Sequence, residues 1–165
     1  MRRWFYLLSL AGLIVGCSGD AGKHIEENDP AYVQAQEFLR AASSRILDGL
    51  EIRGSHESVD TFHVSDCESA PKDEESKRWE VAHFWQVDHV AGGETQPAIE
   101  RLRRSLESQG WHIVDYAVPP EVKNPMIRAE DTKSGYVVRA VAVEDKNRVA
   151  VRVSAPCFTT SKTGS

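Results

Sequence analysis

The sequence has none of the short motifs that mark the common catalytic and nucleotide-binding sites. It lacks a G-x-S-x-G nucleophile elbow, a G-x-x-x-x-G-K-[ST] phosphate loop, an H-E-x-x-H zinc motif and a G-x-G-x-x-G dinucleotide fingerprint. Its adjacent carboxylates, such as Glu26-Glu27 and Glu74-Glu75, fall in charge-rich segments that offer no special environment for acid–base catalysis. We therefore expect a protein that is not an enzyme and that uses no cofactor.

The chain also lacks an excess of positive charge. It has 20 lysines and arginines against 25 aspartates and glutamates, a formal net charge of −5. Proteins that bind nucleic acids usually carry a basic face that displaces counterions from phosphate, so no nucleic-acid partner is expected. Arg101, Arg103 and Arg104 form a cluster, but helical spacing spreads them over the solvent side, which makes a solvated surface the simpler interpretation.

Metal-binding patterns are missing as well. The six histidines do not belong to any Cys/His cluster with zinc-finger spacing. His83 and His89 fall on one face of a predicted strand, but the strand rise puts their backbones about 20 Å apart, too far to share one ion. No metal site is predicted from the histidines alone.

Long apolar runs are also absent, and the longest one that occurs is informative. Residues Trp4 to Val15 are predominantly apolar and follow the cationic start Met1-Arg2-Arg3. A membrane-spanning helix needs roughly 20 apolar residues, so this segment is too short to be one. The pattern instead predicts the charged and apolar regions of a secretory signal peptide.

The residues at the end of the apolar run, Ile14-Val15-Gly16-Cys17, resemble the lipobox of bacterial lipoproteins. The resemblance implies cleavage before Cys17 and attachment of a diacylglyceryl group to its thiol. Residues 1–16 are then a lipoprotein signal peptide and residues 17–29 a lipidated cysteine with a flexible tether. The protein is expected to be extracytoplasmic and anchored to the cell membrane by its N-terminal lipid. Loss of Arg2 and Arg3 leaves the mature chain with a formal net charge of −7.

Two cysteines remain once Cys17 is assigned to lipidation, and an exported protein meets an oxidising environment. A bond between Cys67 and Cys157 would close a long loop, a constraint that the chain-entropy model values at about 4 to 5 kcal/mol. The alternative is a metal site that uses His63 with one or both thiols, since His63 and Cys67 are four residues apart. The disulfide is preferred, because the intervening Val64-Ser65-Asp66 does not have a helical sequence.

Two helices are predicted from apolar residues that recur every three or four positions. The first begins at Asp29-Pro30, a capping residue followed by a proline at the first helical position, and runs for about five turns to Leu50. Residues 51–78 are mixed and mostly polar, and we expect them to form a long loop. The second helix begins near Thr95 and stops at Gly110.

Five strands are predicted from β-branched and aromatic segments bounded by glycine, proline and turn residues. They cover residues 79–90, 111–118, 126–132, 136–144 and 148–155. Apolar and polar residues alternate in the last two, which indicates a sheet with one covered and one wetter face. The element order predicts an α+β two-layer sandwich, a mainly antiparallel sheet of about five strands with two helices. We expect a single domain at residues 30–157 and a disordered tail at 158–165.

The pattern Leu102…Leu106…Gly110-Trp111-x-Ile113-Val114, with Pro156-Cys157 near the end, is similar to a group of small actinobacterial membrane lipoproteins of uncharacterised function. That resemblance implies a lipobox, an α+β domain and a cysteine pair. It implies no catalytic residues.

The aromatic residues of the strands provide the candidate binding region. Trp85, Trp111 and Tyr116, with Trp79 and Phe84, could line a cleft between sheet and helix, although core packing is the commoner role of such residues. Two hypotheses from different classes follow. The first is a structural or protein-interaction module whose partners are other envelope proteins. The second is a protein that binds a small ligand, lipid or metal in the aromatic pocket.

Overall fold

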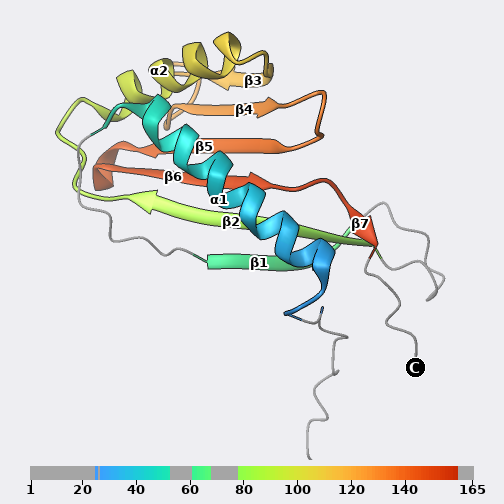
Figure 1. The fold of residues 1–165 in the computed structure, drawn as a ribbon. Coiled ribbons are helices and arrows are strands. Elements are labelled where there is room, and N and C mark those ends of the chain that lie inside the picture. Colours follow the sequence, from blue (N-terminus) through green and yellow to red (C-terminus); the bar gives the residue numbers. More distant parts are fainter. Residues whose placement is uncertain (1–24, 26, 53–60, 68–77, 160–165) are drawn as a thin grey trace, which may run out of the picture.

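The computed structural model describes residues 25, 27–52, 61–67 and 78–159. Its elements are α1 (Pro30–Leu50), β1 (Thr61–Asp66), β2 (Arg78–Val87), α2 (Thr95–Ser108), β3 (His112–Ala117), β4 (Met126–Glu130), β5 (Val137–Val143), the short 3-10 helix η2 (Glu144–Lys146), β6 (Arg148–Ser154) and β7 (Phe158–Thr159). The strands form one antiparallel sheet in the order β1-β2-β6-β5-β4-β3, and β7 pairs with β2. Both helices lie on the same face of this sheet (Figure 1), which confirms the predicted α+β two-layer sandwich.

The first helix begins and ends as its sequence predicts. The Asp29 carboxylate accepts hydrogen bonds from the backbone N–H groups of Ala31 and Tyr32, at 2.8 and 3.3 Å, and Pro30 occupies the first turn. The side chains that face the sheet recur at helical spacing and are buried: Ala35, Leu39, Ala42, Ser43, Ile46 and Leu50. This face of α1 packs on β2 and β6, so the helix is held by burial of one apolar stripe.

The second helix packs against the first at a glycine. A Cβ atom added to Gly49 would lie 2.8 Å from the Ser105 Oγ, so the absence of a side chain lets α1 approach α2 closely. The Arg101 Nε also donates a 3.0 Å hydrogen bond to the Leu50 carbonyl at the end of α1. The expectation that Arg101 belongs to a solvated surface is therefore wrong, because its guanidinium satisfies a helix C-terminus. Helix α2 is followed by Gly110, which adopts a φ of +83°.

The segment expected to be one long loop, residues 51–78, contains a strand. Strand β1 pairs antiparallel with β2, and Phe62 lies opposite His83. The loop prediction is wrong here because a six-residue edge strand with only two apolar side chains, Phe62 and Val64, gives a weak local signal. As an edge strand it pairs on one side only, with β2, which follows it in the chain after residues 68–77.

Strand β7 is the second strand that the sequence did not predict. Phe158 and Thr159 pair with Trp79 and Arg78, so the paired strands continue past Cys157 into the region where we expected a tail. Residues 160–165 lie outside the described residues. The predicted signal peptide, Cys17 and most of the tether do so as well.

The disulfide between Cys67 and Cys157 is confirmed. The two Cα atoms are 6.2 Å apart, and the bond joins residues separated by 90 positions. It links the residue after β1 to the residue before β7. The Cys67 N–H donates to the Arg78 carbonyl at 2.9 Å, and the Arg78 guanidinium donates to the Cys157 carbonyl at 3.3 Å. Both thiols are thereby used, which argues against the alternative metal site with His63.

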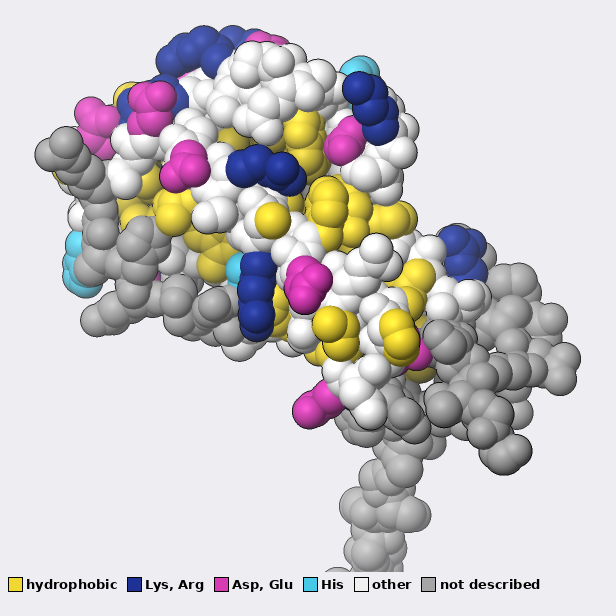
Figure 2. All heavy atoms as spheres, in the orientation of Figure 1, with side chains coloured by type: hydrophobic (Ala, Val, Ile, Leu, Met, Phe, Trp, Pro, Cys, Tyr) yellow, Lys and Arg dark blue, Asp and Glu magenta, His cyan; other side chains and the backbone are white. Residues whose placement is uncertain are grey.

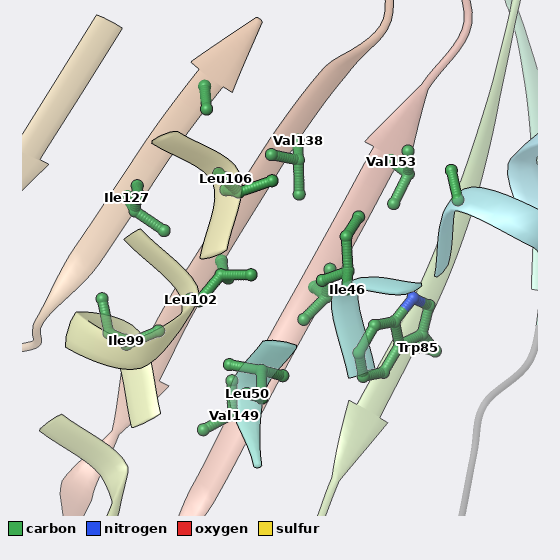
Figure 3. Packing of buried hydrophobic residues seen from close by; sticks show 14 of the residues in the cluster. Ile46, Leu50, Trp85, Ile99, Leu102, Leu106, Ile127, Val138, Val149 and Val153 are labelled. Atoms are coloured by element: carbon green, nitrogen blue, oxygen red, sulfur yellow. The ribbon is translucent and has the colours of Figure 1, made fainter. Parts of the chain in front are cut away.

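The hydrophobic core lies between the helices and the sheet. Figure 3 shows Ile46 and Leu50 of α1 together with Leu102 and Leu106 of α2, above the sheet residues that point toward them. The sheet contributes alternate positions of its central strands, which are Val81, Trp85, Val87, Ile127, Ala129, Val138, Ala140, Ala142, Val149, Val151 and Val153. Because alternate strand residues point to opposite faces, the residues between these positions lie on the other side of the sheet.

Candidate functional site on the uncovered face of the sheet

The three aromatic residues proposed from the sequence do not assemble into one cleft. Trp85 lies on β2 and belongs to the core, where its side chain is 8% exposed (Figure 3). Trp111 and Tyr116 pack against the core from the region of β3, at the far edge of the sheet. The sheet order places four inter-strand steps between β2 and β3, about 19 Å. Trp85 and Trp111 therefore cannot contact the same small ligand.

The opposite face of the sheet is the one that no helix covers among the described residues. On β2, His83 and Trp85 face the helices, so Phe84 and Gln86 face the other way. The same alternation turns Arg139 and Val141 of β5 away from the core, along with Ala150 and Arg152 of β6. We call this side the uncovered face.

A hollow of about 360 Å³ lies on the uncovered face, over the centre of the sheet. It is lined by residues of three adjacent strands: Phe84, Trp85, Gln86, Arg139, Val141, Ala150, Val151 and Arg152. Trp85 and Val151 point their side chains into the core, so they contribute backbone. The floor is then apolar, formed by Phe84, Val141 and Ala150, and guanidinium groups stand beside it. This combination suits a ligand that has an apolar part next to an anionic one.

Three arginines lie in line across the uncovered face. Arg128 of β4 is directly opposite Arg139 of β5, and Arg139 is directly opposite Arg152 of β6. Phe84 of β2 is the next residue in the same line. Like charges directly opposite one another destabilise a sheet. On its other side Arg128 lies opposite Asp115 of β3. The unfavourable pairs of the arginine row (Arg128, Arg139 and Arg152) are therefore the two that involve Arg139.

The members of the arginine row differ in their partners. Arg152 pairs with the Glu80 carboxylate, its Nε donates to the Ser154 Oγ at 3.0 Å, and its guanidinium lies 5.2 Å from the centroid of the Phe84 ring. Arg139 is exposed, and its side chain makes no hydrogen bond or ion pair with any described residue. The Arg128 Nε is buried without a hydrogen-bond partner in the same part of the chain. All three guanidiniums thus retain donors that have no hydrogen-bond partner among the described residues.

The ends of the uncovered face carry compensated charges instead. Arg148 pairs with the Asp88 carboxylate, and the Gln86 side-chain amide donates to that same carboxylate at 2.8 Å. His63 of β1 meets the Phe84 ring edge-on, with centroids 6.3 Å apart. Among the described residues of the uncovered face, the arginines without an ion-pair partner are thus Arg139 in the hollow and Arg128 directly opposite it.

A polar pair lies on the covered face, between the layers. The Ser43 Oγ of α1 and the His83 Nδ1 of β2 are 2.7 Å apart and hydrogen-bonded, with the residues 6% and 5% exposed. Phe62 stacks on the His83 ring at 4.5 Å, and the Arg40 guanidinium lies 4.9 Å from the centroid of Phe62. A serine and a histidine in contact are a familiar nucleophilic pair, but a substrate cannot reach this one. Its chemistry is that of a satisfied interlayer hydrogen bond.

The titratable groups with shifted pKa values lie away from the hollow. Burial raises the pKa of Tyr136, whose ring stacks on Phe38. Burial, with a smaller contribution from Glu100, raises the pKa of Tyr116 against the opposing effect of Arg103. Hydrogen bonds from Ser134 and Lys133 lower the pKa of Asp131 in the turn between β4 and β5. These shifts have structural causes.

Sequence reasoning identified the wetter face but not the hollow. The alternation in residues 136–144 and 148–155 separates the two faces correctly, as the register of β5 and β6 confirms. Counting outward from the predicted Asp145-Lys146-Asn147 turn places Arg139 opposite Val153, one residue out of register. The connection also includes Glu144, and only the observed register brings Arg139 opposite Arg152. Phe84 belongs to the aromatic set suggested for a cleft under the helices, but it lies on the uncovered face. Its proximity to Arg152 depends on pairing between distant strands.

The chain matches no protein-family model, and no curated protein and no solved structure is similar to it. The resemblance to bacterial lipoproteins therefore stays a prediction. Within the described residues, no helix is long and apolar enough to cross a membrane. The same residues hold no group of three or more histidine, cysteine, aspartate or glutamate side chains placed to bind a metal ion.

Proposed function

We propose that this protein is a lipid-anchored, extracytoplasmic binding module of the cell envelope that contacts another envelope protein through its uncovered face. The observation that carries the proposal is the hollow on the side of the sheet that no described helix covers. It has an apolar floor, and its Arg139 side chain is exposed and pairs with no described residue. A charged row that destabilises the fold is readily explained when it serves recognition.

The expected location rests on two independent features. The lipobox-like Ile14-Val15-Gly16-Cys17 supports export and lipidation. The Cys67–Cys157 disulfide supports an oxidising compartment, because such bonds are rare where thiols are kept reduced. With lipid on Cys17, the helical domain that starts after Asp29 would lie within about 40 Å of the membrane surface, the reach of a fully extended twelve-residue tether.

A binding role is favoured over catalysis by the placement of the reactive side chains. Ser43 and His83 are in contact, but both are buried between the layers. The accessible hollow offers arginine, glutamine and apolar side chains. These groups recognise anions and apolar surfaces, and they do not supply a nucleophile.

Lipid anchoring is tested by replacing Cys17 with alanine. We expect the parent protein to incorporate labelled palmitate and to remain with the membrane fraction, whereas the Cys17→Ala variant does neither. A variant that stays membrane-bound and labelled as the parent does would contradict the anchoring proposal. Free-thiol titration of the unfolded, unreduced variant provides a check that the Cys67–Cys157 bond still forms.

The contact face is tested by photo-crosslinking in the cells that produce the protein. A photoreactive residue is placed at Val141, in the hollow, and separately at Val33, which is 38% exposed on α1. We expect a discrete crosslinked product from position 141 and none from position 33. Crosslinking only from Val33, or equally from both positions, would contradict the assignment of the uncovered face.

A second candidate function is favoured by the size of the hollow. Its volume of about 360 Å³ falls at the lower end of the range of about 300 to 1,000 Å³ that small-molecule sites occupy. A small anionic amphiphile would then raise the melting temperature of the parent protein. The same compound would not raise that of a Val141→Glu variant, in which the floor of the hollow is blocked.

A further inference from the structure

We propose that the hollow binds an acidic segment of a partner protein, in which carboxylates meet Arg139 and Arg152 and an apolar side chain lies between them on the floor. This inference rests on the proposed function and specifies the chemistry of the partner. Its basis is the juxtaposition of two directly opposed arginines with Phe84, Val141 and Ala150 in one hollow.

The opposed arginines identify the charge of the partner. Arg139 and Arg152 are directly opposite on neighbouring strands, at a spacing where their positive charges repel. A carboxylate placed between the two guanidiniums would replace repulsion with charge-assisted hydrogen bonds, and a guanidinium can bind a carboxylate through two parallel N–H donors. Among the described residues, no group accepts a hydrogen bond from the Arg139 side chain, and Arg152 keeps one terminal nitrogen without a partner.

The apolar floor identifies the rest of the partner segment. Phe84, Val141 and Ala150 lie beside the arginines, and the Arg152 guanidinium is already held over the Phe84 ring. An anion without an apolar part would leave this floor in water. A segment that presents acidic side chains on either side of an apolar one would cover both features at once.

The charge distribution favours a short acidic segment over an anionic membrane. Two carboxylates also lie on the uncovered face. Glu80 pairs with Arg152, and Asp88 pairs with Arg148. On the helix side, basic and acidic side chains are interspersed (Figure 2). The whole chain carries a formal net charge of −5. Membrane attraction needs a cluster of several unpaired basic residues, whereas one or two carboxylates need only the local pair.

The position of the hollow favours a protein over a small molecule. Small-ligand sites enclose most of the surface of the ligand, about 70 to 90% of it. This hollow lies on the surface of a sheet and is open on its outer side. A partner protein covers its own anchoring side chain from that side, and it buries further contacts on the flat face around the hollow.

The test measures binding of labelled peptides to the mature lipidated protein in detergent micelles by fluorescence anisotropy. The probe is a blocked peptide with two glutamates on each side of one phenylalanine. Matched peptides carry glutamine in place of glutamate, or alanine in place of phenylalanine. We expect each matched peptide to bind about tenfold more weakly than the probe, or weaker still. Hydrogen bonds to charged groups and buried aromatic contacts each contribute this much to affinity.

The matched protein variants are Arg139→Gln and Arg104→Gln. Both remove one exposed guanidinium that has no described partner, the first in the hollow and the second on α2. We expect Arg139→Gln to weaken binding of the probe by about tenfold and Arg104→Gln to leave it unchanged. Because the Arg139 side chain is exposed and pairs with no described residue, we expect the variant to keep its fold, which circular dichroism checks.

Several outcomes would overturn the inference. They are absence of probe binding to the parent, equal binding of the glutamine peptide, equal losses in the two variants, or binding only of inorganic phosphate or phosphatidylglycerol vesicles through Arg139. The proposed function fails separately, by the absence of crosslinking from Val141. A crosslinked partner that is insensitive to Arg139→Gln would sustain that function and refute the acidic segment.

Discussion

The two faces of the sheet are made by the same strands, yet they have opposite compositions. On β5 the residues that face the helices are Val138, Ala140 and Ala142, all fully buried. Between them lie Arg139 and Val141, which face the hollow. The covered face holds the layers together with small and branched apolar side chains, and the uncovered face carries a charged row that opposes stability. The covered face supports folding, and recognition is the role that we propose for the uncovered one.

The largest loss of stability should come from removing the Cys67–Cys157 disulfide, which joins the ends of β1 and β7 and belongs to neither face of the sheet. Replacing both Cys67 and Cys157 with serine should lower the free energy of unfolding by about 2 to 5 kcal/mol, because the unfolded chain loses its long closed loop. Urea unfolding followed by circular dichroism measures the loss, with the reduced parent protein as the control. An unchanged midpoint in both would refute the stabilising role of the disulfide.

Truncating the same residue type on the two faces of β5 compares them directly. Val138→Ala removes fully buried methyl groups under the helices and should cost about 2 kcal/mol. Val141→Ala removes partly exposed ones from the hollow and should cost less than about 1 kcal/mol. Chemical denaturation of both variants provides the measurement. Equal losses would show that the uncovered face is as important for folding as the core.

The interlayer hydrogen bond tests whether polar groups on the covered face are structural. Ser43→Ala leaves the buried His83 Nδ1 without this partner and should cost about 1 to 2 kcal/mol. Ser44→Ala, at the next and exposed position of α1, is the matched control and should cost little. Thermal unfolding compares the two variants. Similar melting temperatures would mean that the Ser43–His83 contact contributes nothing to stability.

Removing a charge from the uncovered face should have the opposite sign. Arg139→Gln relieves repulsion from the arginines directly opposite it and should leave stability unchanged or raise it by less than about 1 kcal/mol. The gain should shrink as salt is added, because exposed charges are screened. Denaturation at low and high ionic strength measures both effects. A clear loss of stability would identify Arg139 as a structural residue.

The smallest effect on stability concerns the turn between β4 and β5, the strands that carry Arg128 and Arg139. Hydrogen bonds from Ser134 and Lys133 hold the pKa of Asp131 below its usual value. The ionised carboxylate therefore stabilises the folded turn at neutral pH, and this contribution disappears as the pH falls through the lowered pKa. In an NMR titration, Ser134→Ala should raise the pKa of Asp131 toward 3.8. An unchanged titration would exclude the serine as the cause.

The sequence by itself determined the local features of this protein. Asp29-Pro30 and an apolar stripe define α1, and alternation in residues 136–144 and 148–155 separates a covered face from a wetter one. Pairing of Cys67 with Cys157 followed from assigning Cys17 to lipidation. Each of these inferences uses positions that are neighbours along the chain, or it uses a simple count, so a local pattern is sufficient.

Only the tertiary structure decided which strands are neighbours. It placed β6 beside β2, which brings Arg152 to Phe84, and it placed β3 at the far edge, which separates Trp111 from Trp85. It also revealed β1, which has too few apolar side chains to be predicted as a strand from its own sequence and which forms by pairing with β2. The physical reason is that a period of two reveals which residues of a strand share a face. Which strand lies next to another depends on hydrogen bonding between segments that are distant along the chain.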